Sequence, residues 1–294
     1  MLEPEALVES RPVPIEFGSY YYSHDCGPTA YRRTEEWIGL FSRLADRIVE
    51  ELAPTRVLDV GCALGLLVEA LRARGVDAWG IDVSEYAVAQ VHESVTDHCA
   101  VSSVADPLPS TFPADFDLVT CIEVVEHIPA EHGPAAITRL SELGSRVLFS
   151  SEPYDYAEPT HVNVRPPEDW SVLFARSGMY RSIETDVSYL TPWAALYERL
   201  DARPAEVLRR YDRAVARLSD ESRQVRATAL RLQANLAELQ DGDAGKLRAL
   251  LDDANTHVEA LDAELTEARR VLGSRTGRSL QAYHAARTKL RRQQ

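Results

Sequence analysis

The sequence has few cysteines, no long apolar run and a shortage of basic residues, and each shortage excludes a class of protein. The four cysteines, Cys26, Cys62, Cys99 and Cys121, have no CxxC spacing, so we expect free thiols in a reducing compartment and no structural zinc site. No apolar stretch approaches the length of a membrane span. The N-terminus carries acids and prolines where a signal peptide needs a basic start and an apolar run. We therefore predict a cytoplasmic protein that does not cross a membrane.

The charge of the chain is strongly acidic but unevenly distributed. A formal net charge of −14 over 294 residues argues against nucleic-acid binding, because phosphate recognition requires a basic surface. Residues 269–294 nevertheless contain eight Lys or Arg and no Asp or Glu. This basic end is either a contact surface for a partner protein, an anionic polymer or a membrane face, or the solvated end of a helix, where basic residues complement the macrodipole.

Up to about residue 193, strand-like and helix-like segments alternate. The strand-like segments are residues 56–60, 78–82, 116–122 and 146–151, and amphipathic segments of helical length separate them. Strands that alternate with helices form βαβ units, so we predict an α/β fold with a Rossmann-like, doubly wound parallel sheet and helices on both faces. We expect an N-terminal segment (1–34), this α/β domain (35–192) and a helical tail (193–294).

The tail carries two heptad patterns. Apolar residues recur at alternating spacings of three and four from Tyr211 to Leu239 and again from Leu247 to Leu272. Between them, DGDAG (241–245) clusters residues that favour turns. The pattern fits an antiparallel helical hairpin within one chain, and it equally fits a coiled coil that makes a homo-oligomer or binds a partner protein.

A glycine-containing turn follows the first predicted strand, in the sequence VLDVGCALG (57–65). Such a turn lets the backbone approach a ligand closely, and the helix after it offers free N–H groups. Three acids accompany the turn: Asp59 before Gly61, Asp82 at the end of the second predicted strand, and Asp106 after the third. A carboxylate in the position of Asp82 can accept hydrogen bonds from both hydroxyls of a ribose.

These motifs, together with FDLVTCIEVVEHI (116–128), resemble the class I S-adenosylmethionine-dependent methyltransferases over about residues 35–192. The resemblance implies S-adenosyl-L-methionine as cofactor and S-adenosyl-L-homocysteine as product. It places the cofactor against Asp59, Gly61, Cys62, Gly65, Asp82, Val83, Ala105, Asp106, Glu123 and Val124. One position departs from the family pattern, because Ala63 stands where many members have a third glycine. Its methyl group is tolerated if φ stays negative.

The stretch EPYDYAEPTHVNVRPPEDW (152–170) follows the last predicted parallel strand directly and contains four prolines. We expect a loop at the carboxyl end of the sheet, where the methyl acceptor enters. An alcohol acceptor must lose a proton, and histidine suits that task. His161 is the leading candidate for the catalytic base and His127 the second, although each could instead order its loop through hydrogen bonds.

We predict no bound metal. A hard divalent cation would find its ligands among Glu152, Asp155, Glu158 and His161. Their spacing in a non-helical segment does not force these side chains to converge.

Residues 20–193 further resemble a bacterial subgroup of methyltransferases that is associated with glycosyltransferases and polysaccharide biosynthesis. The resemblance rests on YYYSHDCGPTAYRRTEEW, EVVEHI, EPTHVNVRPPEDW and SYLTPW. It implies O-methylation of a saccharide hydroxyl, with the N-terminal segment as a lid over the active site. The acceptor-binding residues that we expect are Tyr21, Tyr22, Glu126, Tyr154, Asp155 and Arg165. Two alternatives stay open: an O- or N-methyltransferase of a small natural product, and a non-catalytic scaffold with a degenerate cofactor-binding domain.

Overall fold

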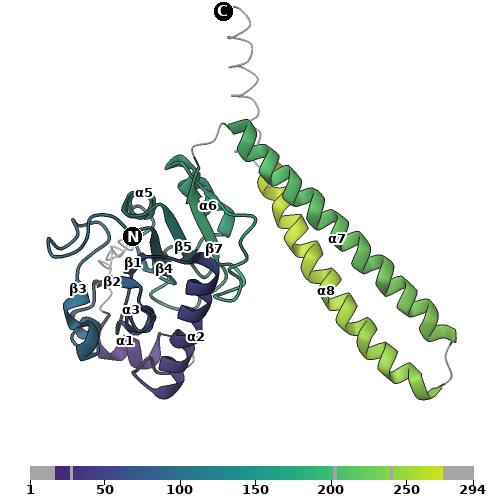
Figure 1. Ribbon diagram of the computed structural model, residues 1–294, viewed down its shortest axis with the longest axis horizontal. Coiled ribbons are helices and arrows are strands. Elements are labelled where there is room, and N and C mark those ends of the chain that lie inside the picture. The colour runs from purple at the N-terminus through teal and green to yellow at the C-terminus, as the bar shows by residue number, and fades with distance from the viewer. Residues whose placement is uncertain (1–16, 27–28, 201–203, 239–240, 274–294) are drawn as a thin grey trace, which may run out of the picture. The chain divides into compact units, whose positions relative to one another are not determined.

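The computed structural model describes residues 17–26, 29–200, 204–238 and 241–273, which belong to two compact units (Figure 1). The first unit ends at Arg199 and the second begins at Leu200. The first unit extends past residue 192, where the sequence suggested a boundary, because its sheet has a further strand there. The acidic N-terminal stretch 1–16 and most of the basic end, residues 274–294, lie outside the described residues.

The first unit is built on a seven-stranded sheet with the order β3-β2-β1-β4-β5-β7-β6. Its strands are β1 Arg56–Val60, β2 Asp77–Asp82, β3 Cys99–Val101, β4 Leu118–Ile122, β5 Arg146–Ser150, β6 Met179–Arg181 and β7 Ala195–Arg199. β3, β2, β1, β4 and β5 are parallel, whereas β7 is antiparallel to β5 and to β6. The predicted Rossmann-like sheet is confirmed, and its strand order reverses between β1 and β4, where open α/β sheets bind ligands.

The helices of this unit are α1 Ser19–His24, α2 Glu35–Leu52, α3 Leu66–Arg72, α4 Glu85–Val88, α5 Gly133–Leu143 and α6 Pro167–Arg176. Two helical expectations need correction. The amphipathic segment after β2 forms only the short α4 and then a 3₁₀ segment, Glu93–His98, in which the Ser94 amide donates to the imidazole of His92. The proline-rich stretch is a loop only as far as Pro166, because Pro167 is a favourable first residue for α6.

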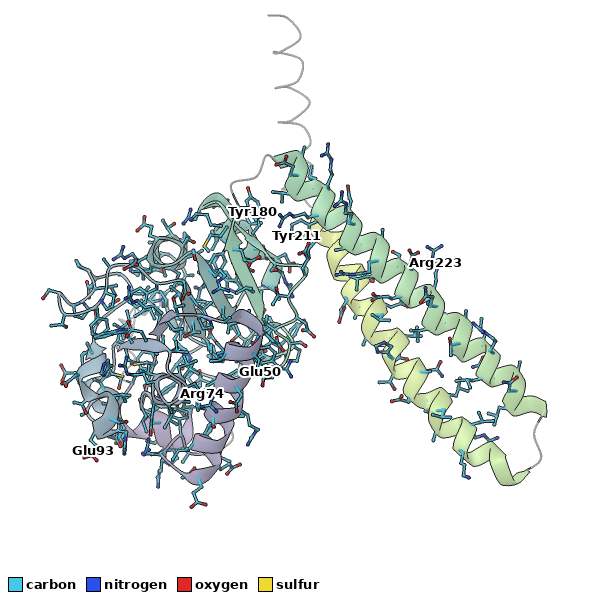
Figure 2. All side chains as sticks on the ribbon, in the orientation of Figure 1. Glu50, Arg74, Glu93, Tyr180, Tyr211 and Arg223 are labelled. Atoms are coloured by element: carbon cyan, nitrogen blue, oxygen red, sulfur yellow. The ribbon has the colours of Figure 1, made fainter. Side chains whose placement is uncertain are left out.

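Helix α2 shows how local sequence fixes a boundary. The Thr34 hydroxyl accepts a hydrogen bond from the amide of Trp37, and two acids, Glu35 and Glu36, occupy the first turn. Arg74 (Figure 2) then ties the segment after α3 to α2, because its Nε donates to Asp46 Oδ1 at 2.7 Å. These contacts hold α2 and α3 on one face of the sheet.

The core lies on both faces of the parallel strands. Leu58 and Val60 of β1 belong to a buried cluster with residues of α5 and α6, whereas Val57 belongs to a second cluster with residues of α2 and α3. Burial on both faces explains why these strands appear in the sequence as nearly continuous apolar runs. Leu58 is fully buried, and truncating such a leucine to alanine costs about 2–5 kcal/mol.

The second unit is a helical hairpin of α7 Pro204–Glu238 and α8 Asp241–Gly273, which lie side by side and antiparallel (Figure 1). The heptad seam faces the partner helix: Ala229 of α7 and Leu261 and Leu265 of α8 are buried. The expected turn at 241–245 is wrong, because DGDAG forms the start of α8.

The polar interruption in the seam has a partner. Ser222 is buried, and its hydroxyl donates to Asp262 Oδ1 at 3.0 Å, while Arg226 pairs with the other carboxylate oxygen.

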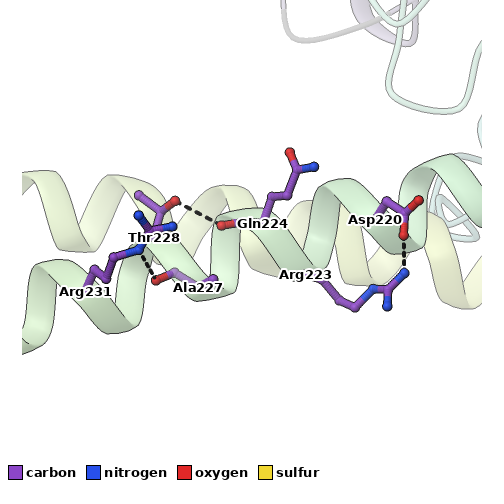
Figure 3. Close-up of a pocket in the computed structure, with 6 residues that line it drawn as sticks. All are labelled: Asp220, Arg223, Gln224, Ala227, Thr228 and Arg231. Atoms are coloured by element: carbon purple, nitrogen blue, oxygen red, sulfur yellow. Dashed lines mark hydrogen bonds and ion pairs between the residues drawn. The ribbon is translucent and has the colours of Figure 1, made fainter.

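A hollow of about 620 Å³ lies on the outer side of α7, lined by Asp220, Arg223, Gln224, Ala227, Thr228 and Arg231 (Figure 3). Its polar contacts are bonds within one helix, such as Thr228 Oγ1 to the Gln224 carbonyl at 2.9 Å. Nothing in this set resembles a catalytic arrangement.

Two expectations from composition can be compared with the structure. All four cysteines are free thiols, and three of them are buried. Among the described residues, no helix combines the length and apolar character needed to cross a membrane.

Candidate active site

The turn after β1 has the backbone of a ligand cradle. Gly61 and Gly65 have φ values of +80° and +68°, a region that glycine enters without steric cost. The amides of Gly61 and Cys62 both donate to the carbonyl of Ile81, at 2.8 and 3.0 Å, and the Gly65 amide closes the turn on Cys62. A Cβ on Gly61 would lie 2.3 Å from Val124 Cγ2, so no larger residue fits.

Ala63 departs from expectation in its conformation. Its φ is +47°, so the negative φ under which its methyl group would be tolerated is not observed. The strain is compensated by a hydrogen bond, because the Ala63 amide donates to Asp82 Oδ2 at 2.8 Å. The left-handed region costs an alanine about 1–2 kcal/mol. The turn therefore holds an alanine in a backbone conformation suited to glycine.

Two buried acids lie at the carboxyl ends of β1 and β2. Asp59 is 5% exposed and accepts a hydrogen bond from Thr120 Oγ1 at 2.6 Å, from the position paired with it on β4. Burial raises the pKa of Asp59 to about 7. Asp82 is also buried, and its Oδ1 accepts from the Ser84 amide at 2.8 Å. Burial likewise raises the pKa of Asp82, and the two amide donors oppose that rise.

The remaining predicted cofactor residues lie on loops at the same edge of the sheet. Cys62 is buried against β2, where a Cβ on Gly80 would come within 2.8 Å of its sulfur. Val83 is exposed after β2. Ala105 and Asp106 are exposed in the loop after β3, and the Ala105 amide donates to the Ser103 hydroxyl at 3.1 Å.

The loop after β4 brings a second strained residue to the site. Glu123 has a φ of +52°, and its amide donates to the carbonyl of Ser150 at the end of β5. Its Oε1 accepts a hydrogen bond from Trp193 Nε1 at 2.9 Å. Trp193 was not expected as a site residue, and its only signal in the sequence was its place in the SYLTPW motif. Val124, next in the chain, covers Gly61.

The 3₁₀ turn Val125–His127 follows Val124 and carries two predicted site residues, Glu126 and His127. Glu126 is fully buried, and its Oε1 accepts from the Glu152 amide at 3.2 Å. Burial, followed by the charge of Glu123, raises the pKa of Glu126 well above its usual 4.5. His127 has partners at both nitrogens: Nε2 lies 3.3 Å from the Tyr21 hydroxyl, and Nδ1 lies 3.2 Å from the Thr160 carbonyl. Burial lowers the pKa of His127 to about 4, and the charge of His161 contributes.

The loop after β5 brings His161 to His127, and their ring centroids are 4.8 Å apart. His161 Nδ1 lies 3.0 Å from the Asp155 carbonyl, and its Nε2 is 3.5 Å from Glu158 Oε2. Thr160 connects the two histidines, because its hydroxyl is 2.9 Å from His127 Nδ1 and donates to Glu158. The two candidate bases therefore form one cluster.

The other predicted acceptor-binding residues differ in their exposure and contacts. The Tyr21 hydroxyl contacts His127 Nε2, and Tyr154, on the loop after β5, is 75% exposed. Tyr22 is buried against Tyr86, with ring centroids 5.9 Å apart. Arg165 donates to Asn163 Oδ1 at 2.6 Å and lies over the ring of Trp170. Asp155 uses Oδ1 to accept from the amides of residues 157 and 158.

The turn and the two buried acids fit S-adenosylmethionine. The glycines give this turn its positive φ values at Gly61 and Gly65, and the turn lies between the end of β1 and the N-terminus of α3, where helix amides are free to bind a ligand. Asp82 ends β2 with a carboxylate held in place by two amides, and carboxylate oxygens have further lone pairs for a ribose.

Comparisons with known proteins agree with this fit. Residues 29–180 match the family described as a methyltransferase domain. A ubiquinone biosynthesis O-methyltransferase of Methylococcus capsulatus is 40% identical over 109 residues, which cover 34% of this chain and 44% of that protein. The corresponding protein of Pseudomonas fluorescens is 36% identical over 133 residues, which cover 44% of this chain and 52% of that one. The chain thus spans about half the length of the curated relatives that it matches.

Among solved structures, the magnesium protoporphyrin IX methyltransferase of Synechocystis with bound SAH is 18% identical, with a TM-score of 0.46. The match covers 62% of this chain and 98% of that one. The amino pentose methyltransferase CalS10 is 16% identical with a TM-score of 0.44, over 57% of this chain and 93% of that one. By the match to residues 29–180, which is more than half of its length, the chain belongs to this family of methyltransferase domains.

Proposed function

We propose that this protein transfers a methyl group from S-adenosylmethionine to a hydroxyl of a saccharide, in polysaccharide biosynthesis. The observation that carries the proposal is the histidine pair, His127 and His161, 4.8 Å apart between ring centroids. The pair lies on the loops after β4 and β5, beside the strand-order reversal where the cofactor cradle lies. A site of this kind can accept the proton that a hydroxyl loses during methylation.

The two histidines have different roles in this proposal. Bound S-adenosylmethionine supplies an electrophilic methyl group on a sulfonium sulfur. As the acceptor oxygen forms the new C–O bond, the C–S bond breaks with its electron pair on sulfur, which leaves neutral S-adenosylhomocysteine, and the hydroxyl proton passes to Nε2 of His161. This nitrogen is the acceptor because Nδ1 donates to the Asp155 carbonyl at 3.0 Å. The pKa of His127, about 4, is too low for a base at neutral pH, so His127 orients the acceptor.

The loop after β5 favours a saccharide. Tyr154 and Tyr156 are 75% and 73% exposed there, and such rings stack on sugar faces while offering hydroxyls. Glu158 and His161 add polar groups on the same loop. Hydroxyl-rich acceptors need such hydrogen-bonding groups, because unpaired hydroxyls are costly to bury.

A small natural product with a ring hydroxyl is the second candidate. The Phe17 ring contacts Tyr21 and His127 edge to face, with centroids 5.0 and 5.7 Å apart. These rings form an apolar wall on the acceptor side of the cluster. The name of the curated relatives, ubiquinone biosynthesis O-methyltransferase, also supports oxygen as the methylated atom.

The first experiment is a calorimetric titration with S-adenosylmethionine and S-adenosylhomocysteine, with Asp82→Ala as the non-binding control. Saccharide and ring-hydroxyl acceptors are then screened for transfer of a labelled methyl group, with His161→Ala as the test variant and His132→Ala, an exposed histidine on another loop, as its match. We expect saccharide methylation that His161→Ala reduces at least about 100-fold, within the range of general base catalysis. Methylation of ring hydroxyls alone would support the second candidate. Absence of cofactor binding would support the scaffold alternative and direct attention to the α7–α8 hairpin.

A further inference from the structure

Glu126, His127 and His161 form a cluster with the donor set of a metal centre. Each offers one ligand atom, and these atoms all lie within 4.8 Å of one another. Glu126 and His127 come from the turn after β4, and His161 comes from the loop after β5, which is the neighbouring parallel strand. Of the four residues that the sequence suggested as cation ligands, only His161 belongs to this cluster.

Hydrogen bonds orient both imidazoles for ligation through Nε2. A backbone carbonyl can only accept, so His161 Nδ1 donates to Asp155 and His127 Nδ1 donates to Thr160, at 3.0 and 3.2 Å. Each Nε2 is then left with a lone pair. Metal-binding histidines commonly have this arrangement, in which the other ring nitrogen donates to a carbonyl. The Tyr21 hydroxyl lies 3.3 Å from His127 Nε2, a long contact that a stronger ligand bond can replace.

The third ligand is a carboxylate oxygen of Glu126. Glu126 is fully buried, and its Oε2 has no hydrogen-bond partner among the described residues. A buried polar atom without a partner costs free energy. The carboxylates of Glu123 and Glu158 lie nearby and add negative charge to the surroundings. A bound cation would compensate Glu126 and the charge around it.

We infer that Glu126, His127 and His161 bind one divalent transition-metal cation, of the Mn²⁺, Co²⁺ or Zn²⁺ kind. Two imidazole nitrogens and one carboxylate oxygen suit these ions better than Mg²⁺ or Ca²⁺, which prefer oxygen ligands. Three protein ligands also leave coordination positions open for an acceptor.

The role of the cation rests on the proposed function. An acceptor hydroxyl that occupies an open position has a lowered pKa. Its oxygen forms the C–O bond, the C–S bond of the sulfonium breaks with its electron pair on sulfur, and the hydroxyl proton is released to water. With the cation bound, His161 is a ligand and no longer the base.

Metal binding is tested without any acceptor. Tag-free protein is stripped with EDTA and titrated with Co²⁺, whose visible absorption reports coordination, and Zn²⁺ and Mn²⁺ are measured by competition. We expect one Co²⁺ per chain in the wild type and in His132→Ala. Glu126→Gln keeps the shape of the buried side chain, and His161→Ala changes a loop residue. Each should weaken Co²⁺ binding at least about 100-fold, because losing a residue that only hydrogen-bonds to a metal ligand already weakens binding by up to about 100-fold. Unchanged S-adenosylmethionine binding in both variants shows that they fold.

The outcomes separate this inference from the proposed function. Absence of Co²⁺ binding, or equal binding by wild type and both cluster variants, overturns the metal site. Metal-free protein that methylates its acceptor at the full rate overturns the catalytic role and leaves His161 as the base. Metal binding without methylation of any saccharide would support the site while contradicting the proposed acceptor.

Discussion

Asp59→Asn isolates the energetic cost of the buried acid under the cofactor cradle. Asp59 is 5% exposed, and the Thr120 hydroxyl donates to its Oδ1 at 2.6 Å. Asparagine has the same shape and keeps an acceptor oxygen for Thr120, but it carries no charge at any pH. The comparison of aspartate with asparagine therefore measures what ionisation in this position costs the fold.

The sign of the effect follows from the direction of the pKa change. Burial raises the pKa of Asp59 from its ordinary 3.8 to about 7, so the folded state holds the proton more tightly than the unfolded state does. Below pH 4 both states are protonated and the group costs nothing. Between pH 4 and pH 7 the unfolded state ionises first, and the free energy of unfolding falls. At about 1.4 kcal/mol per pKa unit, the loss approaches about 4 kcal/mol above pH 7.

Tryptophan fluorescence in a urea titration is the appropriate assay. All four tryptophans, Trp37, Trp79, Trp170 and Trp193, lie in the first unit, so unfolding of the helical hairpin does not contribute to the signal. We expect the stability difference, wild type minus Asp59→Asn, to fall by about 4 kcal/mol between pH 4 and pH 8. Because other titrating groups occur in both proteins, they cancel in the difference. A difference that is flat over this range, or rises with pH, would refute the reasoning.

Four further substitutions follow, three in the same cradle and one, Gly75→Ala, at a control glycine outside it. Gly61→Ala places a methyl group 2.3 Å from Val124 Cγ2 and should lower the unfolding free energy by about 2–3 kcal/mol, from overpacking and left-handed strain. Gly75→Ala, at φ +82° with open space around it, should cost only the backbone part, about 1 kcal/mol, by the same fluorescence assay. Ala63→Gly should raise stability by up to about 1 kcal/mol, because it relieves a φ of +47°, and equal or lower stability would contradict that strain. Asp82→Ala should weaken S-adenosylmethionine binding at least about 100-fold by calorimetry. The amides of Ala63 and Ser84 lose their carboxylate acceptor, and so do the ribose hydroxyls that we expect Asp82 to bind.

The parallel strands β1, β2, β4 and β5 were predictable because most of their residues are buried, on both faces of the sheet. Residues 56–60 form β1 as predicted, and the predicted segment 146–151 corresponds to β5. The antiparallel strands β6 and β7 were missed. β6 has three residues and pairs antiparallel with β7 across more than ten intervening residues. Such pairings join residues far apart in the chain, and no local sequence pattern predicts them.

The site was predictable as a set of motifs but not as a set of contacts. The resemblance pointed to Glu126 and His127, and the proline-rich loop offered His161 as a candidate base, yet their convergence depends on β4 and β5 being neighbours. The hydrogen bond from Trp193 to Glu123 likewise joins residues 70 positions apart. Sequence spacing carries information along one strand or helix, whereas this cluster is assembled across two loops.

Backbone strain marks the same place independently of any motif. The described residues include three non-glycine residues with positive φ: Ala53, Ala63 and Glu123. Ala53 ends α2, where left-handed residues are ordinary. The other two follow β1 and β4, the pair of strands between which the sheet order reverses. Strain of about 1–3 kcal/mol persists only where surrounding contacts enforce it, and such residues cluster at ligand sites. Ala63 is held by Asp82, and Glu123 by Ser150 and Trp193. The fold therefore keeps unfavourable backbone conformations at the two turns that would face the cofactor. A degenerate domain would have no reason to retain this strain.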